Sequence, residues 1–197
     1  MSKRLISRTE VPFAPSNENT FSLSIVKEVW ETDRGEKTYW KYSLPNTVQI
    51  FALTTEGQII AISEFQPGVG ADYLHLPGET MEQGETSLEA AVRGLLEETG
   101  YKAGSAKLLS SILENSGRSD RLVHIVLITE CSKTESEGEK EIKVVLLSPN
   151  EFWNRLMQYF VTNPDYKHGG GNTLKAATLA FSQLCFISTF PENERRQ

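Results

Sequence analysis

The first part of the chain alternates between apolar and polar positions with the period of a β-strand. From Thr20 to Ile25 the apolar residues fall at every second position, and a second run with this period covers Thr38–Ser43. Residues 33–35 read Asp-Arg-Gly, which is a turn sequence, so the two runs predict a β-hairpin. Residues 1–19 are polar and contain two prolines, and we expect them to form an arm or a loop.

The middle of the chain carries a more hydrophobic pair of strands and then a helix. Val48–Thr54 and Gln58–Glu64 predict a second hairpin that is buried on both faces. Residues 85–99 predict a helix, with a capping box at residues 86–89 and Gly100 just past its end. Its apolar residues recur at three- and four-residue spacing and predict one buried stripe: Leu88, Ala91, Val92, Leu95 and Thr99.

Further strands and helices complete the pattern. Strands are predicted at residues 106–113, 122–129 and 142–148, and helices at residues 149–161 and 172–186. Residues 132–140 are charged and predict a loop. Strands that are flanked by helices, mostly without strand–helix–strand alternation, indicate an α/β (α+β) fold.

Composition narrows the class of protein. Hydrophobic residues make up 39% of the 197 positions and charged residues 23%, which is typical of a globular domain. The net charge of −6 argues against nucleic-acid binding, which needs a basic face. The sequence has no apolar run near the roughly 18 residues of a membrane span, and no apolar segment follows the basic start as it would in a secretory signal. Cys131 and Cys185 lack metal-ligand spacing, so we expect both to be reduced thiols that serve only in packing. We therefore expect a cytoplasmic protein.

The predicted helix at 85–99 carries the candidate chemistry. Gly94, Glu97 and Glu98 are spaced i, i+3 and i+4, so they project from one side of the helix. Neighbouring carboxylates repel one another unless a cation neutralises them, and hard oxygen ligands suit Mg²⁺ or Mn²⁺. Glu85 and Arg93 are suited to pair and to hold the preceding loop in place. The alternative is an ordinary solvated acidic helix face.

The segment around this helix resembles the Nudix box, G-x5-E-x7-R-E-U-x-E-E-x-G-U, where U is a bulky apolar residue. Aligned on Gly100, the sequence matches the motif at these positions: Glu85, Arg93, Leu95, Glu97, Glu98 and Tyr101. Two positions differ. The first glycine of the motif is Glu79 here, with Gly78 displaced by one, and the glutamate after the arginine is Gly94.

The resemblance covers about residues 20–185, and it is nearest to the branch that hydrolyses ADP-ribose and nucleoside diphosphate sugars. It implies a Nudix α/β/α sandwich with a mixed central sheet and an N-terminal antiparallel β extension. The implied domains are an arm and β extension for dimerisation at residues 1–46, a Nudix domain at 47–190 and a tail at 191–197. The implied partners are a nucleotide-type small molecule and a second copy of the chain, with neither nucleic acid nor membrane.

The resemblance also implies roles for particular residues. Glu97 and Glu98 would bind Mg²⁺ or Mn²⁺ and act in catalysis with Arg93, and a base would come from the acidic loop, with Glu139 as the candidate. The structural residues of the box would be Gly78, Glu85 and Gly100. Trp40 and Arg118 are candidates for substrate binding. For the aromatic residues of the N-terminal hairpin, we favour simple packing over stacking on a base.

Four departures from the family pattern bear on activity, at His75, Gln66, Gly94 and the Glu79 position described above. His75 stands where the branch often has a metal-binding glutamate, and Gln66 lies in the stretch that commonly holds an arginine. Gly94 supplies no carboxylate, and a glycine inside a helix costs about 1 kcal/mol relative to alanine. Gly94 could allow a ligand or a neighbouring backbone to approach closely. Replacement carboxylates could come from Glu79 or from the acidic loop (Glu137, Glu139 or Glu141).

The function expected from this pattern is metal-dependent hydrolysis of a nucleoside diphosphate linked to another moiety, with ADP-ribose or a nucleoside diphosphate sugar as substrate, and with slow turnover. The alternatives are a catalytically impaired Nudix-fold module that binds or senses a nucleotide, and a structural domain with an extinct site. His124 lies in a predicted strand, where we expect a packed or hydrogen-bonded histidine. His168 begins a run of glycines that we interpret as a connector.

Overall fold

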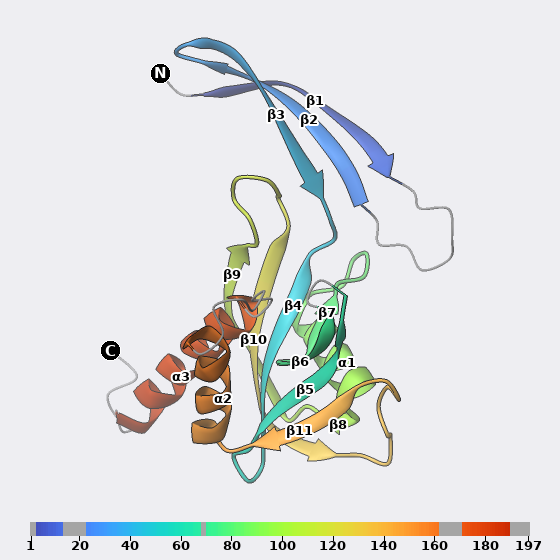
Figure 1. The fold of residues 1–197 in the computed structure, drawn as a ribbon, viewed down its shortest axis with the longest axis vertical. Helices are drawn as coiled ribbons and strands as arrows, with labels where there is room; N and C mark the ends of the chain where they lie inside the picture. The colour runs from blue at the N-terminus through green and yellow to red at the C-terminus, as the bar shows by residue number, and fades with distance from the viewer. Residues whose placement is uncertain (1–2, 14–22, 68–69, 162–170, 190–197) are drawn as a thin grey trace.

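The chain folds into two β-sheets with three helices in the part that the structure describes (Figure 1). The computed structural model describes residues 3–13, 23–67, 70–161 and 171–189. The connector predicted around His168 lies outside these residues. Among the described helices, none is long and apolar enough to cross a membrane.

The smaller sheet is formed by the N-terminal part of the chain. Its antiparallel strands are β1 (Arg4–Phe13), β2 (Leu23–Thr32) and β3 (Gly35–Ser43), in the order β1-β2-β3. The predicted hairpin is therefore confirmed as β2 and β3. The arm or loop predicted for residues 1–19 is wrong for residues 4–13, which form the third strand by pairing with β2. Local sequence gave little sign of β1 because its pairing partner lies up to 27 residues away.

The larger sheet has eight strands and is mixed. Its strands are β4 (Thr47–Thr54), β5 (Ile59–Gln66), β6 (Ala71–His75), β7 (Gly78–Thr80), β8 (Tyr101–Lys102), β9 (Ser105–Leu113), β10 (Leu122–Lys133) and β11 (Lys143–Leu147). The main order is β11-β5-β4-β10-β8, with β6 on β5, β7 on β4 and β9 on β10. Only the central β4–β10 pair is parallel among the described strand pairs.

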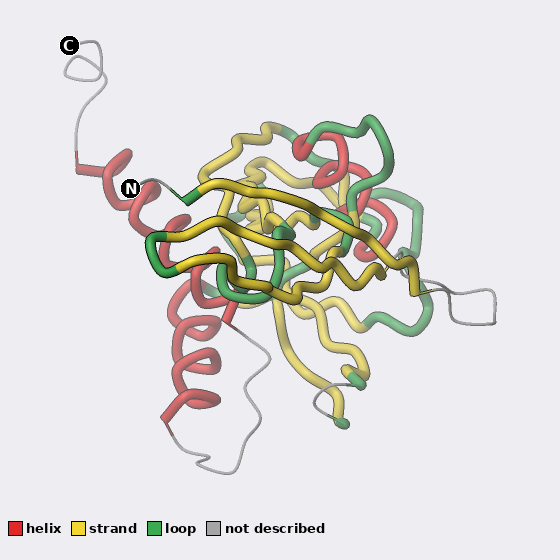
Figure 2. The backbone as a smooth tube through the Cα atoms, turned by 90° about the horizontal axis from the view of Figure 1, so that it is seen from above, coloured by secondary structure: helices red, strands yellow, loops and turns green. Residues whose placement is uncertain are grey.

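Alternation along the central strands sends side chains into two separate cores. On one face, Phe51 and Leu127 pack with Phe152 of α2 (Pro149–Val161) and Ala177 of α3 (Gly171–Thr189). On the other face, residues that include Ile50 and Val126 pack against α1 (Ser87–Thr99). Helices therefore lie on both sides of the strands (Figure 2), and the predicted α/β/α sandwich with a mixed sheet is confirmed.

Helix α1 begins and ends as its sequence predicts. The Thr86 side chain accepts a hydrogen bond from the backbone of Glu89, the Glu89 side chain accepts one from the backbone of Thr86, and Gly100 ends the helix in the left-handed conformation. The predicted buried stripe is only partly correct. Its members Leu88 and Val92 are exposed, whereas the buried positions include Gly94 and Glu98. The buried face is therefore shifted around the helix relative to the prediction, and Gly94 and Glu98 lie against β7.

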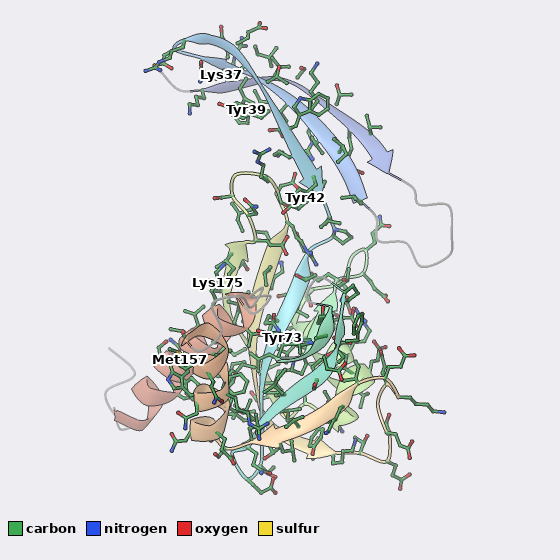
Figure 3. The ribbon with its side chains drawn as sticks, viewed as in Figure 1. Lys37, Tyr39, Tyr42, Tyr73, Met157 and Lys175 are labelled. Carbon is green, nitrogen blue, oxygen red and sulfur yellow. The ribbon has the colours of Figure 1, made fainter. Side chains whose placement is uncertain are left out.

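The small sheet is attached to the large one through the loop between β9 and β10. The backbone nitrogen of Tyr42, which is labelled at the end of β3 in Figure 3, donates to the Arg118 carbonyl at 2.9 Å. Asp120 of the same loop accepts ion pairs from Arg8 at 3.1 Å and from Lys41 at 3.5 Å. Both cations also pair with the buried Glu28. This charged cluster ties β1, β2 and β3 to the rest of the chain.

Candidate functional site

Arg93 fixes the loop that leads from β7 into α1. Its guanidinium donates twice to the Glu85 carboxylate, at 2.9 and 3.0 Å, and once to the Thr80 carbonyl at 3.0 Å. A further bond to Glu97 at 3.0 Å runs along the helix. The hydrogen bonds with Glu85 raise the pKa of Arg93, and those with Arg93 lower the pKa of Glu85. The pairing of Glu85 with Arg93 expected from the sequence is confirmed.

Glu98 projects from α1 into the space beside β7 and is buried, with 8% of its surface exposed. Its carboxylate accepts a hydrogen bond from the Gly78 backbone at 3.3 Å. Burial raises the pKa of Glu98 to about 8, and the nearby charges of Glu79, Glu64 and Glu139 add to this effect. None of the ion pairs among the described residues supplies Glu98 with a cationic side chain.

The acidic loop between β10 and β11 lies against the end of α1. The Lys133 ammonium donates to the Thr99 carbonyl at 2.9 Å, and the Thr134 backbone donates to the Gly100 carbonyl at 3.0 Å. Gly138 approaches the helix so closely that a Cβ there would lie 2.8 Å from the Glu98 carbonyl oxygen. These contacts place the next residue, Glu139, in electrostatic reach of Glu98.

Glu139 is exposed to solvent, yet its carboxyl titrates abnormally. Desolvation, followed by the charges of Glu79, Glu64, Glu97 and Glu141, raises its pKa. The sequence candidate from the acidic loop thus shares one electrostatic environment with the box glutamates. Glu97 differs from Glu98, since half of its side chain is exposed and its carboxylate pairs with Arg93.

Gln66 and His75, the two residues before the box that differ from the family pattern, contact each other. The Nε2 atoms of Gln66 and His75 lie 3.3 Å apart, and both side chains contact Oε1 of Glu64, at 2.8 Å from Gln66 and 3.1 Å from His75. The His75 ring also stacks on Tyr73, with ring centroids 5.9 Å apart. His75 therefore lies beside Glu64, whose charge reaches Glu98. Glu64 itself was missed from the sequence, although its place at the end of a hydrophobic strand was a usable signal.

Glu79 and Gly94, the two residues inside the box that differ from the motif, also lie in contact. A Cβ built on Gly94 would lie 2.6 Å from the Cβ of Glu79, so the Glu79 side chain occupies the space beside the glycine. The Glu79 carboxylate lies 3.4 Å from the Arg93 guanidinium. The close approach suggested for Gly94 is thus made by a neighbouring side chain rather than by a ligand or a backbone.

The remaining sequence candidates lie elsewhere. Trp40 is 55% exposed on β3, and Lys27 lies over its ring at 5.9 Å. Arg118 lies in the β9–β10 loop, where its backbone bonds to β3. No described contact joins either residue to Glu98. His124 bonds to the Ser111 hydroxyl at 2.7 Å, as expected of a hydrogen-bonded strand histidine, and its pKa is lowered by burial. Cys131 is free and buried, as expected.

The carboxylates around Glu98 suit a divalent cation in type and in charge. A buried carboxylate that is surrounded by others is a costly arrangement without a counter-charge, and oxygen ligands are those that Mg²⁺ and Mn²⁺ prefer. In the described part of the chain, no three His, Cys, Asp or Glu side chains already converge on one point. A cation held by three carboxylates would therefore require side-chain rotation of Glu79, Glu64 or Glu139 toward Glu98.

Comparison with known proteins places the chain in a family. The NUDIX domain matches residues 43–166, which is more than half of the chain, and the chain belongs to this family. It is 33% identical over 95 residues to the ADP-ribose pyrophosphatase of Bacillus subtilis (strain 168), and that match covers 48% of this chain and 51% of the relative. It is 28% identical over 92 residues to the methanol dehydrogenase activator of Bacillus methanolicus, which covers 47% and 50%.

A third relative is the ADP-sugar pyrophosphatase of Mus musculus, which is 35% identical over 71 residues, or 36% of this chain and 33% of the relative. The chain thus spans about half the length of the two bacterial relatives and a third of the mouse protein. The crystal structure of an ADP compounds hydrolase resembles the whole fold, with a TM-score of 0.70 over 94% of this chain and 96% of that one. Its 19% sequence identity makes this a likeness of fold.

Proposed function

We propose that the protein is a metal-dependent hydrolase that cleaves the diphosphate of a nucleoside diphosphate linked to another moiety, with ADP-ribose or a nucleoside diphosphate sugar as substrate. The observation that carries this proposal is the buried Glu98, which is surrounded by carboxylates beside a loop that Arg93 holds in place. The relatives named as pyrophosphatases of ADP-ribose and ADP-sugars agree with this substrate class.

Glu98 would hold the cation, with Glu97 and neighbouring carboxylates as further oxygen ligands. When bound, Mg²⁺ or Mn²⁺ would neutralise the diphosphate and polarise its phosphorus–oxygen bonds. Arg93 would act by positioning, because its four hydrogen bonds connect α1 to Glu85 of the β7–α1 loop and to Thr80 of β7, and run along the helix to Glu97. Gly78, Glu85 and Gly100 would serve as structural residues, since they form the hydrogen bond to Glu98, the pair with Arg93 and the end of α1.

Glu139 is the candidate general base. A carboxylate with a raised pKa accepts a proton more readily than an ordinary one, and Glu139 lies at the solvent edge of the cluster. Water would attack one phosphorus of the diphosphate and pass a proton to Glu139. The bond from that phosphorus to the bridging oxygen would break, and the products would be a nucleoside monophosphate and a sugar phosphate.

The small sheet would contribute to a homodimer. Six of its large apolar or aromatic side chains are exposed, between 39% and 57%, and they are Leu5, Ile6, Val11, Ile25, Tyr39 and Trp40. Where such side chains form a contiguous patch on one face of the sheet, a partner usually covers it. Trp40 and Arg118 lie apart from Glu98 within one chain, so a role for them in substrate binding would require a site completed by the partner subunit.

A binding module without turnover is the competing function, and one experiment separates the two. A panel of ADP-ribose, nucleoside diphosphate sugars and dinucleoside polyphosphates is incubated with Mg²⁺ or Mn²⁺, and release of nucleoside monophosphate is measured beside ligand binding by calorimetry. Hydrolysis that Glu98→Gln abolishes supports the enzyme. Binding of a panel member without hydrolysis, under both metals, would instead favour the sensing module.

A further inference from the structure

The Glu79–Gly94 contact joins the two positions at which the box departs from its motif. A Cβ at residue 94 would lie 2.6 Å from the Glu79 Cβ and 3.1 Å from its Cγ. Such a separation is far inside van der Waals contact. The Glu79 Cβ is placed by the backbone of β7, which pairs with β4, so side-chain rotation cannot relieve the overlap. A side chain at residue 79 and one at residue 94 therefore exclude each other.

The Glu79 side chain crosses the face of α1 at this point. Its Oε2 atom lies 3.7 Å from the place where a Cβ at residue 94 would stand, and 3.4 Å from the Arg93 guanidinium. Glu98 accepts a hydrogen bond at 3.3 Å from the backbone of Gly78, the residue that precedes Glu79 in β7. A carboxylate is thus present beside Gly94, although it comes from the strand and not from the helix.

We propose that the carboxylate missing from α1 at Gly94 is supplied from β7 by Glu79, so that a glutamate and a glycine have exchanged places across one contact. This inference rests on the proposed function in so far as the cation is the one that the hydrolase would use. Glu79 and Glu98 would then hold that cation together. The exchange also accounts for a glycine in the middle of a helix, where it would otherwise only lower stability.

The exchange predicts how four variants relate to one another. Glu79→Gly removes the relocated carboxylate, and Gly94→Glu adds a helix carboxylate that collides with Glu79. The double variant Glu79→Gly/Gly94→Glu restores the motif order without the collision. Glu79→Gln keeps the volume of the side chain and removes its charge. Glu82→Gln is the matched control, because it removes an exposed carboxylate from the same loop.

Two readouts besides activity test the exchange. The first is the thermal midpoint of the metal-free protein. Gly94→Glu alone should lower it by roughly 4–8 °C through overpacking, and the added Glu79→Gly change should recover most of this loss. The second is the Mn²⁺ dissociation constant, measured by electron paramagnetic resonance. It should rise at least about tenfold in Glu79→Gln and Glu79→Gly, return toward the original value in the double variant, and stay unchanged in Glu82→Gln.

Two results would overturn the exchange. One is a Glu79→Gln protein that binds Mn²⁺ as tightly as the unmodified protein. The other is a double variant that melts no higher than Gly94→Glu alone. These outcomes are independent of turnover. If no panel substrate is hydrolysed while the Mn²⁺ affinities follow the predicted order, the proposed function fails and the exchange stands.

Discussion

The carboxylate of Glu98 lies 3.3 Å from the backbone nitrogen of Gly78, and this hydrogen bond joins the last turn of α1 to the first residue of β7. The bond is too weak to offset the cost of burying an ionised carboxylate among other carboxylates, so the pKa of Glu98 stands at about 8. In the proposed function Glu98 holds a cation in its charged form, whereas the metal-free fold holds this carboxyl best in its neutral form. Under that proposal, stability and function would oppose each other at this position.

Glu98→Gln should stabilise the metal-free protein at alkaline pH. In the unfolded chain the carboxyl ionises near its ordinary pKa of 4.5, whereas in the folded chain it ionises near 8. Stability is therefore highest below the lower value and is lost as pH rises through the upper one. Each pKa unit corresponds to about 1.4 kcal/mol, so the variant should gain several kcal/mol above about pH 8. Urea unfolding in EDTA across this pH range measures the gain.

The control for this pH series is Glu137→Gln, which alters an exposed carboxylate of the acidic loop. It should change the stability by less than about 0.5 kcal/mol at every pH. A Glu98→Gln protein whose stability follows that of the unmodified protein at all pH values would show that Glu98 is not held neutral. In the presence of Mn²⁺ the unmodified protein should be more stable than Glu98→Gln, because only the unmodified protein gains stability from binding the metal.

Gly138→Ala should detach the acidic loop from α1. The new Cβ would lie 2.8 Å from the Glu98 carbonyl oxygen, and the backbone φ of +74° is itself unfavourable for alanine. Displacement of the loop moves Glu139 from the cluster, and a shift of about 1 Å in an active site can cost on the order of a hundredfold in rate. The turnover number of the panel substrate, measured at saturation, checks this prediction.

Gly57→Ala provides the matched control for the loop. Gly57 has nearly the same φ, +77°, but a Cβ there would meet nothing within 4 Å. Both variants should lose about 1–2 kcal/mol of stability from the backbone conformation, and only Gly138→Ala should lose turnover. Equal turnover in the two proteins would argue that the docking of this loop does not matter to the reaction.

Much of the fold could be predicted from sequence because its signals are local. The capping box at Thr86 and the glycine at residue 100 fixed both ends of α1. Period-two alternation located β2, and hydrophobic runs located β4 and β5. The strands that were missed, β1, β6, β7 and β8, are either short or held by partners distant in sequence, so no local periodicity marks them.

The candidate site was predictable as a set of residue types, but its spatial partners were not. The motif identified Glu85, Arg93 and Glu98, and the first two form the expected pair. It could not show that Glu97 turns to Arg93 while Glu98 is buried, because both lie in one helical turn and the packing of β7 decides between them. The contact between Glu79 and Gly94 is likewise a property of the β7–α1 packing, which is invisible in a one-dimensional motif.

Arg93→Lys should damage the protein although it keeps the positive charge. Arg93 donates to Glu85 with two nitrogens and reaches the Thr80 carbonyl and Glu97 as well, and a lysine ammonium cannot reproduce this planar arrangement. We expect a loss of about 1–3 kcal/mol in the free energy of unfolding, measured in urea. Arg155→Lys, on the exposed face of α2, should change it by less than about 0.5 kcal/mol. Equal effects of the two substitutions would refute the role assigned to Arg93.

The homodimer is testable at Trp40, whose side chain is 55% exposed on a sheet that contacts the β9–β10 loop through the Arg8–Lys41–Asp120 cluster and the Tyr42–Arg118 backbone hydrogen bond. Large aromatic side chains contribute most to protein interfaces, so Trp40→Ser should raise the dimer dissociation constant by at least about tenfold. Sedimentation velocity over a range of concentrations measures this constant. Leu108→Ser, which replaces a 41% exposed apolar side chain on β9, is the control and should leave the constant unchanged.

Two outcomes would contradict this prediction. A protein that sediments as a monomer up to high micromolar concentration would refute the homodimer, and with it the proposal that Trp40 and Arg118 reach the site of the partner subunit. A dimer that both variants leave intact would locate the interface away from the small sheet.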